Sequence, residues 1–117
     1  MRKLSKAEYD LIVHLLKYTP DNQHIIDKLP SMLVEEMNDG VMGSLKFLYD
    51  NKSQQRFGKQ IAEISLLDKD GVPISLAINL DIEGNIYELD VFKADSSELV
   101  EFPTPPYNEL PPSKANT

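Results

Sequence analysis

The chain has 117 residues, contains no cysteine and carries a formal net charge of −7 at pH 7. This length is typical of one domain with a small core, and the lack of cysteine excludes disulfides, thiolate catalysis and cysteine-ligated metals. Nucleic-acid-binding domains usually present a basic surface, so the acidic balance argues against a nucleic-acid partner and favours a basic one.

The first expected element is an amphipathic helix that begins after Ser5. The sequence Ser5-Lys6-Ala7-Glu8 matches a capping box, in which Ser5 is the N-cap and Glu8 stands at the third helical position. The apolar stripe expected to face the core consists of Tyr9, Ile12, Val13 and Leu16, and Leu11, Leu15 and Tyr18 widen it. Pro20 ends the helix because the residue before a proline avoids the α region. A short second helix is expected over residues 22–28, with Asp21 as its cap.

Two strands are expected next, over residues 32–37 and 44–49, separated by a turn signal at residues 38–40. The connecting segment is the most unusual local sequence, and its candidate binding residues are Asp39, Gly40, Met42, Gly43 and Ser44. One interpretation is a loop whose backbone N–H groups accept a ligand or an anion. The other is a tight turn or bulge in which Gly43 lets Met42 enter the core.

Residues 59–93 are predicted to form three consecutive antiparallel strands. Strict alternation over residues 72–81 places one face in a core and the other outside. Short loops at residues 69–71 and 83–84 then set the register. The predicted inward pairs are Leu66 with Ile74, Ile64 with Leu76, Leu80 with Tyr87 and Ile78 with Leu89.

These elements predict an α+β fold in which one or two N-terminal amphipathic helices pack on an antiparallel β-meander of five or six strands. Residues 98–102 are expected to form a last short strand. Residues 1–102 are assigned to a single domain and residues 103–117 to a flexible, Pro-rich tail, because this stretch offers little to bury.

The predicted register collects carboxylates on the outward face of the sheet, from Glu63, Glu88 and Asp90. Such a group performs acid–base chemistry or holds a hard cation in some proteins, but polar residues are also ordinary on the wet face of a sheet. Glu63 and Asp90 lie two strands apart, so their Cα atoms are expected about 9–10 Å from each other, which is wide for a shared metal. Phe92 on this polar face indicates that something covers part of it.

No residue is assigned a catalytic role. His14 and His24 are the only histidines, and they lack the spacing of a metal site. Ser44 has no recognisable base nearby and stands outside a nucleophile elbow. We therefore expect neither a cofactor nor a metal. No apolar stretch is long enough for a signal peptide or a membrane span, which predicts a cytoplasmic protein without a membrane partner.

Two segments resemble a family of uncharacterised bacterial domains. Residues 37–47 resemble its M-x-D-G-G-M-G-S-L-x-F segment, with Val41 in place of the second glycine. Residues 87–95 resemble its E-L-D-x-W-K-x-D ending, with Phe92 in place of tryptophan. The family carries no assigned activity, and small α+β domains of this kind occur among bacterial immunity proteins against secreted toxins, which is an analogy of class.

The leading hypothesis is a non-enzymatic protein-binding module that uses the acidic sheet face and the 38–44 loop to hold a basic protein. An immunity-type inhibitor of a toxin is one such module. The first alternative is a small-ligand-binding protein or an enzyme, with a site near residues 39–44 and 88–90. The second alternative is a structural homodimer joined through the outward face.

Overall fold

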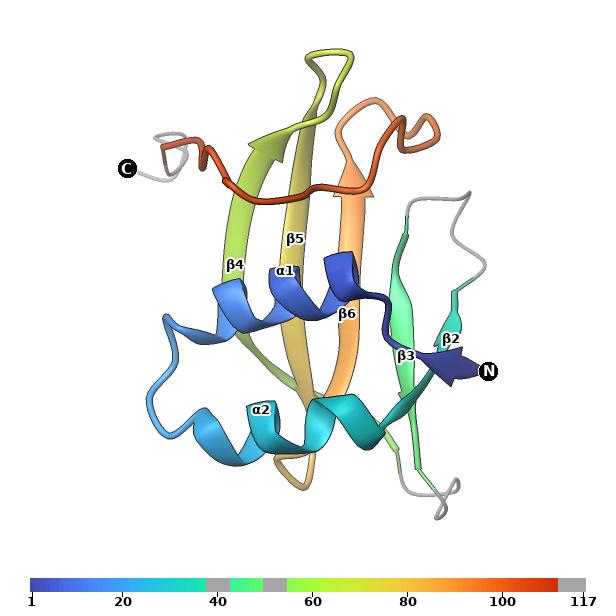
Figure 1. The fold of residues 1–117 in the computed structure, drawn as a ribbon, viewed down its shortest axis with the longest axis vertical. Helices are drawn as coiled ribbons and strands as arrows, with labels where there is room; N and C mark the ends of the chain where they lie inside the picture. Colours follow the sequence, from blue (N-terminus) through green and yellow to red (C-terminus); the bar gives the residue numbers. More distant parts are fainter. Residues whose placement is uncertain (38–42, 50–54, 112–117) are drawn as a thin grey trace.

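The structure, a computed structural model, describes residues 1–37, 43–49 and 55–111. Its elements are β1 (Arg2–Lys3), α1 (Lys6–Leu16), α2 (Gln23–Lys28), a 3-10 turn (Leu29–Ser31), β2 (Leu33–Glu36), β3 (Leu45–Leu48), β4 (Phe57–Leu67), β5 (Pro73–Asp81) and β6 (Ile86–Lys93). The two helices lie on one face of a six-stranded antiparallel sheet, which confirms the expected α+β fold class (Figure 1).

The order of the strands across the sheet is β1-β2-β3-β6-β5-β4. The strands β4, β5 and β6 form the expected meander, but β3 pairs with β6 and leaves β4 at the far edge. The sixth strand is β1, which pairs with β2. The prediction of a strand over residues 98–102 is wrong. The N–H groups of Val100 and Glu101 donate to the carboxylate of Asp68 and not to a neighbouring strand.

The register of the meander follows the expectation over most of its length. On the core side, the confirmed pairs are Leu66 with Ile74, Ile64 with Leu76 and Ile78 with Leu89. On the opposite side, the rows Glu63–Ala77–Asp90 and Ser65–Ser75–Phe92 run across three strands. The register of β4 shifts between Gln60 and Ala62, as at a β-bulge, so Gln60 lies opposite Asn79.

The turn between β5 and β6 differs from the expected two-residue loop. Leu80 pairs with Ile86 and not with Tyr87. The cause is Asp81, whose carboxylate accepts the backbone N–H of Asn85 at 3.0 Å and closes a wider turn. Such side-chain to backbone bonds are typical of aspartate in turns.

Helix α1 begins with the expected capping box at Ser5 and Glu8. Its fully buried residues are Leu11, Ile12, Leu15 and Leu16, all of which belong to the expected widened stripe. Tyr9 and Val13 are only half-buried, and Tyr18 is exposed. The expected cap of α2 at Asp21 is wrong, because Asn22 holds that position. No helix of the described residues is long and apolar enough to cross a bilayer.

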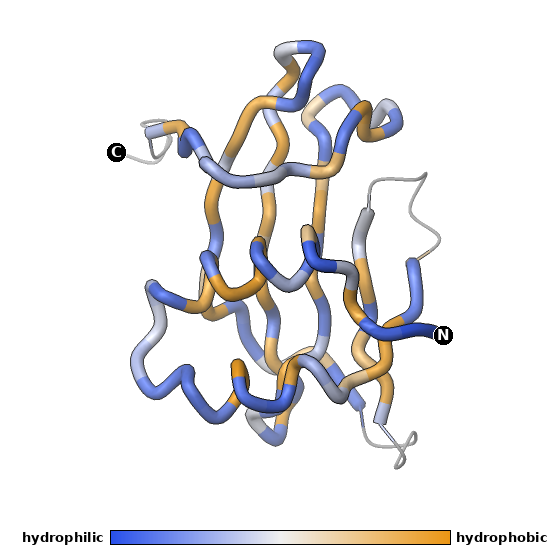
Figure 2. Tube along the Cα trace, in the orientation of Figure 1, coloured by the Kyte–Doolittle hydropathy of each residue, from blue (hydrophilic) through white to orange (hydrophobic). Residues whose placement is uncertain are grey.

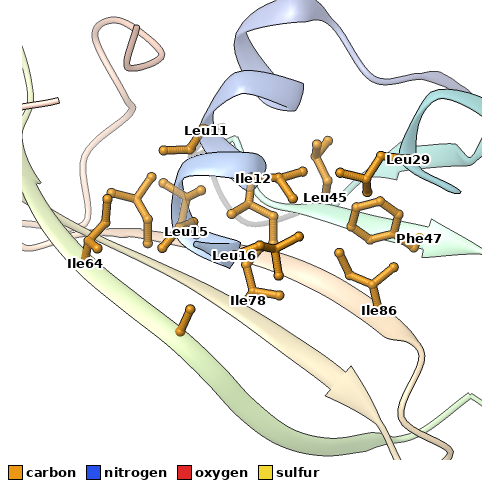
Figure 3. Packing of buried hydrophobic residues seen from close by; sticks show 14 of the residues in the cluster. Leu11, Ile12, Leu15, Leu16, Leu29, Leu45, Phe47, Ile64, Ile78 and Ile86 are labelled. Carbon is orange, nitrogen blue, oxygen red and sulfur yellow. The ribbon is translucent and has the colours of Figure 1, made fainter. Parts of the chain in front are cut away.

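The core lies between the helices and the sheet. Hydrophobic residues concentrate along the strands and the helices, while hydrophilic residues occupy the loop tips (Figure 2). The side chains of α1 meet Ile64 and Ile78 from the meander, and Leu45 and Phe47 from β3 (Figure 3). All four helix residues and Phe47 are fully buried, so α1 closes this face of the sheet.

Residues 98–111, which we call the clasp, cross the same face of the sheet as α1, from the end of β6 to β4 (Figure 1). We expected a mobile tail from residue 103 onward, yet residues 103–111 contact the domain. The N–H of Leu110 donates to the carbonyl of Ser65 at 2.8 Å, and Tyr107 packs half-buried against the core. The Tyr107 side chain and the Leu110 backbone thus supply contacts that are not evident from the proline-rich composition. Residues 112–117 lie outside the described residues.

Candidate functional site

The face of the sheet opposite the helices and the clasp, which we call the outer face, carries four of the nine expected binding residues, Glu63, Glu88, Asp90 and Phe92. Its central residues, on β4, β5 and β6, are Glu63, Ser65, Leu67, Ser75, Ala77, Asn79, Glu88, Asp90 and Phe92. Phe92 is 49% exposed and Leu67 is 53% exposed, whereas the alternating residues on the other face are buried. The outer face therefore combines apolar side chains with carboxylates in solvent.

The expected carboxylates differ in their surroundings. Glu63 is exposed and accepts a hydrogen bond from the Ser75 hydroxyl at 2.9 Å. Glu88 is half-buried and accepts one at 2.9 Å from the amide of Asn79, a residue only 6% exposed. Asp90 is exposed in the same row as Glu63. In the described part of the chain, no cluster of three or more His, Cys, Asp or Glu side chains is placed to hold a metal ion.

Gly43 and Ser44, the described residues of the unusual loop, line a hollow of about 310 Å³ near the start of α1. Gly43 has a φ of +92°, and a Cβ there would lie 3.3 Å from the ring of Phe102. The glycine is therefore explained by a left-handed turn and by packing against the clasp. The other three expected binding residues of this loop, Asp39, Gly40 and Met42, lie outside the described residues.

The charged groups of this hollow are already paired. Both Glu8 oxygens accept hydrogen bonds from the guanidinium of Arg2, at 2.7 and 2.8 Å, and the Ser5 backbone N–H donates to the same carboxylate. Burial raises the pKa of Glu8, but these bonds outweigh it and lower the pKa below the usual range. A carboxylate in this state is a structural group and a poor general base.

The structure separates the two parts of the expected ligand site. The hollow at Gly43 and Ser44 lies on the helix side, because α1 residues, Leu99 and Phe102 line it. Glu88 and Asp90 alternate with the buried Leu89 and Val91, so they lie on the outer face. A single small ligand does not reach both sets of residues across the sheet.

Ser44 has a structural task at this position. Its buried hydroxyl donates to the carbonyl of Val91 at 3.1 Å and accepts from the N–H of Val91 at 2.8 Å. The hydroxyl thus continues the contact between β3 and β6 beyond the last backbone pair. Ser44 is consequently not poised as a nucleophile.

Replacing Ser44 with alanine is expected to lower the free energy of unfolding by about 1–3 kcal/mol, because both backbone groups of Val91 lose their partner in a buried place. Urea denaturation measures the loss. Ser31→Ala is the matched control, since the Ser31 hydroxyl donates to a carbonyl at an exposed position. Equal stability of the two variants would contradict the structural role of Ser44.

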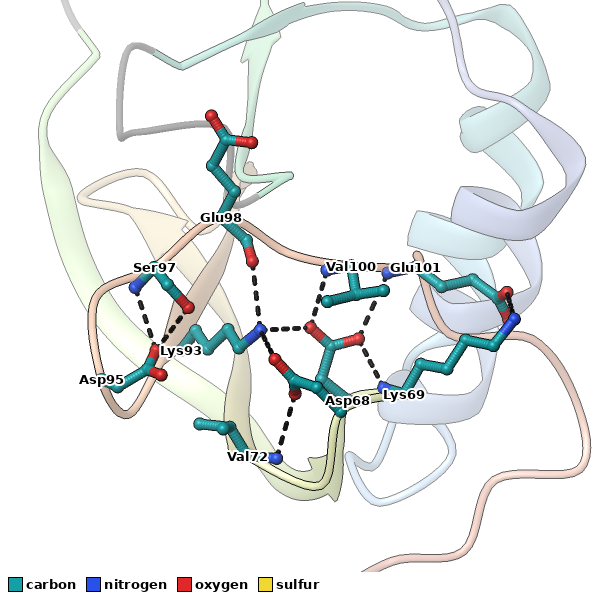
Figure 4. A network of polar contacts seen from close by, with 10 residues as sticks. Asp68, Lys69, Val72, Lys93, Asp95, Ser97, Glu98, Val100 and Glu101 are labelled. Carbon is teal, nitrogen blue, oxygen red and sulfur yellow. Dashed lines mark hydrogen bonds and ion pairs between the residues drawn. The ribbon is translucent and has the colours of Figure 1, made fainter.

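A buried ion network at the end of the sheet was not foreseen from the sequence (Figure 4). The ammonium of Lys93, with a side chain 0% exposed, lies 2.8 Å from Asp68 and 2.6 Å from Asp70. It also donates to the carbonyl of Glu98 at 3.1 Å. The network joins the β4–β5 turn, the end of β6 and the start of the clasp. In the sequence, the lysine of the E-L-D-x-F-K-x-D segment is the feature that could have indicated this network.

Asp68 is the centre of this network. Burial raises the pKa of its carboxyl, but the ammonium of Lys93 and the backbone N–H groups of Val100, Lys69 and Glu101 outweigh burial and bring the pKa down to about 2. For Lys93, burial lowers the pKa, and the bonds to the two aspartates raise it above the usual value. Both groups therefore stay charged in the folded protein.

These features define a small α+β domain with one sheet face covered by helices and a clasp, while neither a helix nor the clasp covers the other face in the described part of the chain. The chain belongs to the family described as a domain of unknown function, DUF6984, which matches residues 1–103. The matched range includes the whole sheet and the Lys93 network. No curated protein and no solved structure matches the chain.

Proposed function

We propose that the protein is a non-enzymatic binding module whose outer face docks on a basic surface of another protein. The observation that carries the proposal is Phe92, which is 49% exposed and stands beside the exposed Glu63–Asp90 row. Large exposed apolar side chains surrounded by polar groups are typical of protein interaction sites. Neither helix nor the clasp lies on this face (Figure 1).

The charges on the outer face favour a basic partner over a second copy of the chain. In a twofold dimer the same patch meets itself, so the row of Glu63 and Asp90 would approach other carboxylates. Opposite charges, in contrast, accelerate encounter and orient the partner. The net charge of −7 acts in the same direction at longer range.

An immunity-type inhibitor fits this description. A toxin that cleaves nucleic acid needs a basic surface for its substrate, and an acidic protein surface can occupy that place. The absence of cysteine suits a reducing compartment, so we place this action in the cytoplasm. The immunity-type role also rests on the analogy with bacterial immunity proteins, among which small α+β domains of this kind occur.

A small-ligand site is the second candidate function, favoured by the hollow of about 310 Å³ at Gly43 and Ser44. The hollow lies near the N-terminus of α1, where backbone N–H groups attract anions. It ranks below the outer face because Arg2, its cation, is already held by Glu8. Isothermal titration with inorganic phosphate tests this candidate, and heat that disappears in Arg2→Ala would favour it.

The test of the main proposal uses the variant Glu63→Lys/Asp90→Lys. The partner is first captured from a lysate of the source organism, identified and purified, and its association rate with each variant is then measured at low and high salt. We expect the double variant to associate about tenfold more slowly at low salt, with the difference shrinking as salt screens the charges. Glu88 is left intact because it holds Asn79.

The matched control is Glu83→Lys/Glu98→Lys, which makes the same change in net charge at exposed positions away from the outer face. Equal association rates for the two double variants would remove the outer face from the mechanism. Phe92→Ser adds an independent readout, because loss of a buried aromatic contact mainly increases the dissociation rate. Urea denaturation of every variant verifies that the fold persists.

A further inference from the structure

We infer that the clasp consists of two parts with different stability, and that residues 103–111 open away from β4 while the rest of the domain stays folded. In this arrangement residues 98–102 act as a fixed hinge and residues 103–111 as a cover. Opening of the cover requires no binding partner.

The hinge is held by buried charge-assisted bonds. The carboxylate of Asp68 accepts the N–H of Val100 at 2.7 Å and the N–H of Glu101 at 3.2 Å, and Lys93 donates to the carbonyl of Glu98 (Figure 4). The side chains of Asp68 and Lys93 are 0% exposed. Breaking such bonds leaves buried charges without partners, so this part separates only when the domain unfolds.

The polar side-chain contacts that hold the cover are more exposed to water than those of the hinge. Glu109 accepts one hydrogen bond from the Tyr18 hydroxyl at 2.7 Å and lies 2.6 Å from the ring nitrogen of His14, with 29% of its side chain exposed. The Leu110 N–H bonds to the carbonyl of Ser65. Exposed pairs of this kind contribute little to stability, because water replaces them readily.

The cover also lies over an incompletely filled space. Residues 103–110 line a hollow of about 490 Å³ together with Leu66 and Leu67 of β4. Tyr107 packs half-buried against the core, with its ring centroid 4.6 Å from that of His14. Opening of the cover therefore gives up little packing, and it uncovers Leu66 and the carbonyl of Ser65 at the edge of the sheet.

The absence of native cysteine makes opening measurable by thiol labelling. One variant carries Leu66→Cys, beneath the cover, and a second carries Ile78→Cys, in the middle of β5. Cys labelling is followed in the native state at increasing urea. We expect the thiol at 66 to react faster than the thiol at 78 and with a weaker dependence on urea, because local opening exposes less surface than global unfolding.

Glu109→Ala, added to each cysteine variant, is expected to accelerate labelling at 66 about fivefold and to leave labelling at 78 nearly unchanged. Glu101→Ala is the matched control, since its exposed carboxylate lies in the hinge and pairs with Lys69 at 3.5 Å. Equal rates and equal urea dependence at 66 and 78 would overturn the inference. An unchanged rate at 66 in Glu109→Ala would do the same.

Discussion

Asp68→Ala is expected to lower the free energy of unfolding by about 3–5 kcal/mol, because it removes one partner of a buried ion pair and strands the other. The ammonium of Lys93 would keep only Asp70 and one carbonyl as partners. The variant also deprives three backbone N–H groups of their acceptor, on Lys69, Val100 and Glu101. Urea denaturation at about pH 7 measures the loss.

Two further variants test whether the stability lost in Asp68→Ala comes from the buried ion pair. Glu101→Ala removes an exposed carboxylate from the same segment and is expected to cost less than about 1 kcal/mol. Asp68→Ala/Lys93→Met removes both buried charges and is expected to recover part of the stability lost in Asp68→Ala. A double variant less stable than the single one would contradict this account of the network.

The same network predicts how stability changes in acid. The pKa of Asp68 is about 2 in the folded protein, below the value of about 3.9 for an unfolded aspartate. A depressed pKa stabilises the fold fully above the unfolded value, and this contribution disappears as the pH falls from about 4 toward 2. Stability curves of the wild type should therefore fall more steeply across this window than those of Asp68→Ala.

Leu76→Ala is expected to cost about 2–5 kcal/mol, which is the second of the largest effects. Leu76 is 0% exposed and lies on the central strand β5, where Ile64 pairs with it on one side and Val91 on the other. The surrounding strands are held by their backbone ladders, so they cannot collapse into the space that the substitution leaves. Urea denaturation gives the difference in unfolding free energy.

Leu67→Ala is the matched control for this substitution. Leu67 belongs to the neighbouring strand β4, but its side chain is on the outer face and 53% exposed. Its removal is expected to change stability by less than about 0.5 kcal/mol. Similar losses for Leu67→Ala and Leu76→Ala would mean that the two faces of the sheet are assigned the wrong way round.

Local sequence patterns predicted the secondary structure and most of the register. The capping box placed the start of α1 at Ser5, and the alternation over residues 72–81 assigned the two faces of β5. Both signals depend on interactions between residues close in the chain, which a single sequence displays directly. One exception was the turn at Asp81, where one side-chain hydrogen bond changed the loop and shifted the pairing of Leu80. Another was β4, whose register shifts between Gln60 and Ala62.

The outer face was predicted from the sequence because it follows from the register. Once Ala77 is paired with Glu63 and Asp90, the period of two places Phe92 on the same side. The loop at residues 38–44 was a weaker prediction. Its described part, Gly43 and Ser44, makes packing and hydrogen-bond contacts that explain those two residues structurally.

The sequence by itself determined the helix start, the faces of the strands and the composition of the outer face, because each depends on neighbours within a few residues. Only the tertiary structure decided that β3 pairs with β6, that Lys93 meets Asp68 and that residues 103–111 lie against β4. These contacts join segments distant in the chain, and their free energy comes from burial and charge pairing. A local sequence pattern does not show which distant segment supplies the partner.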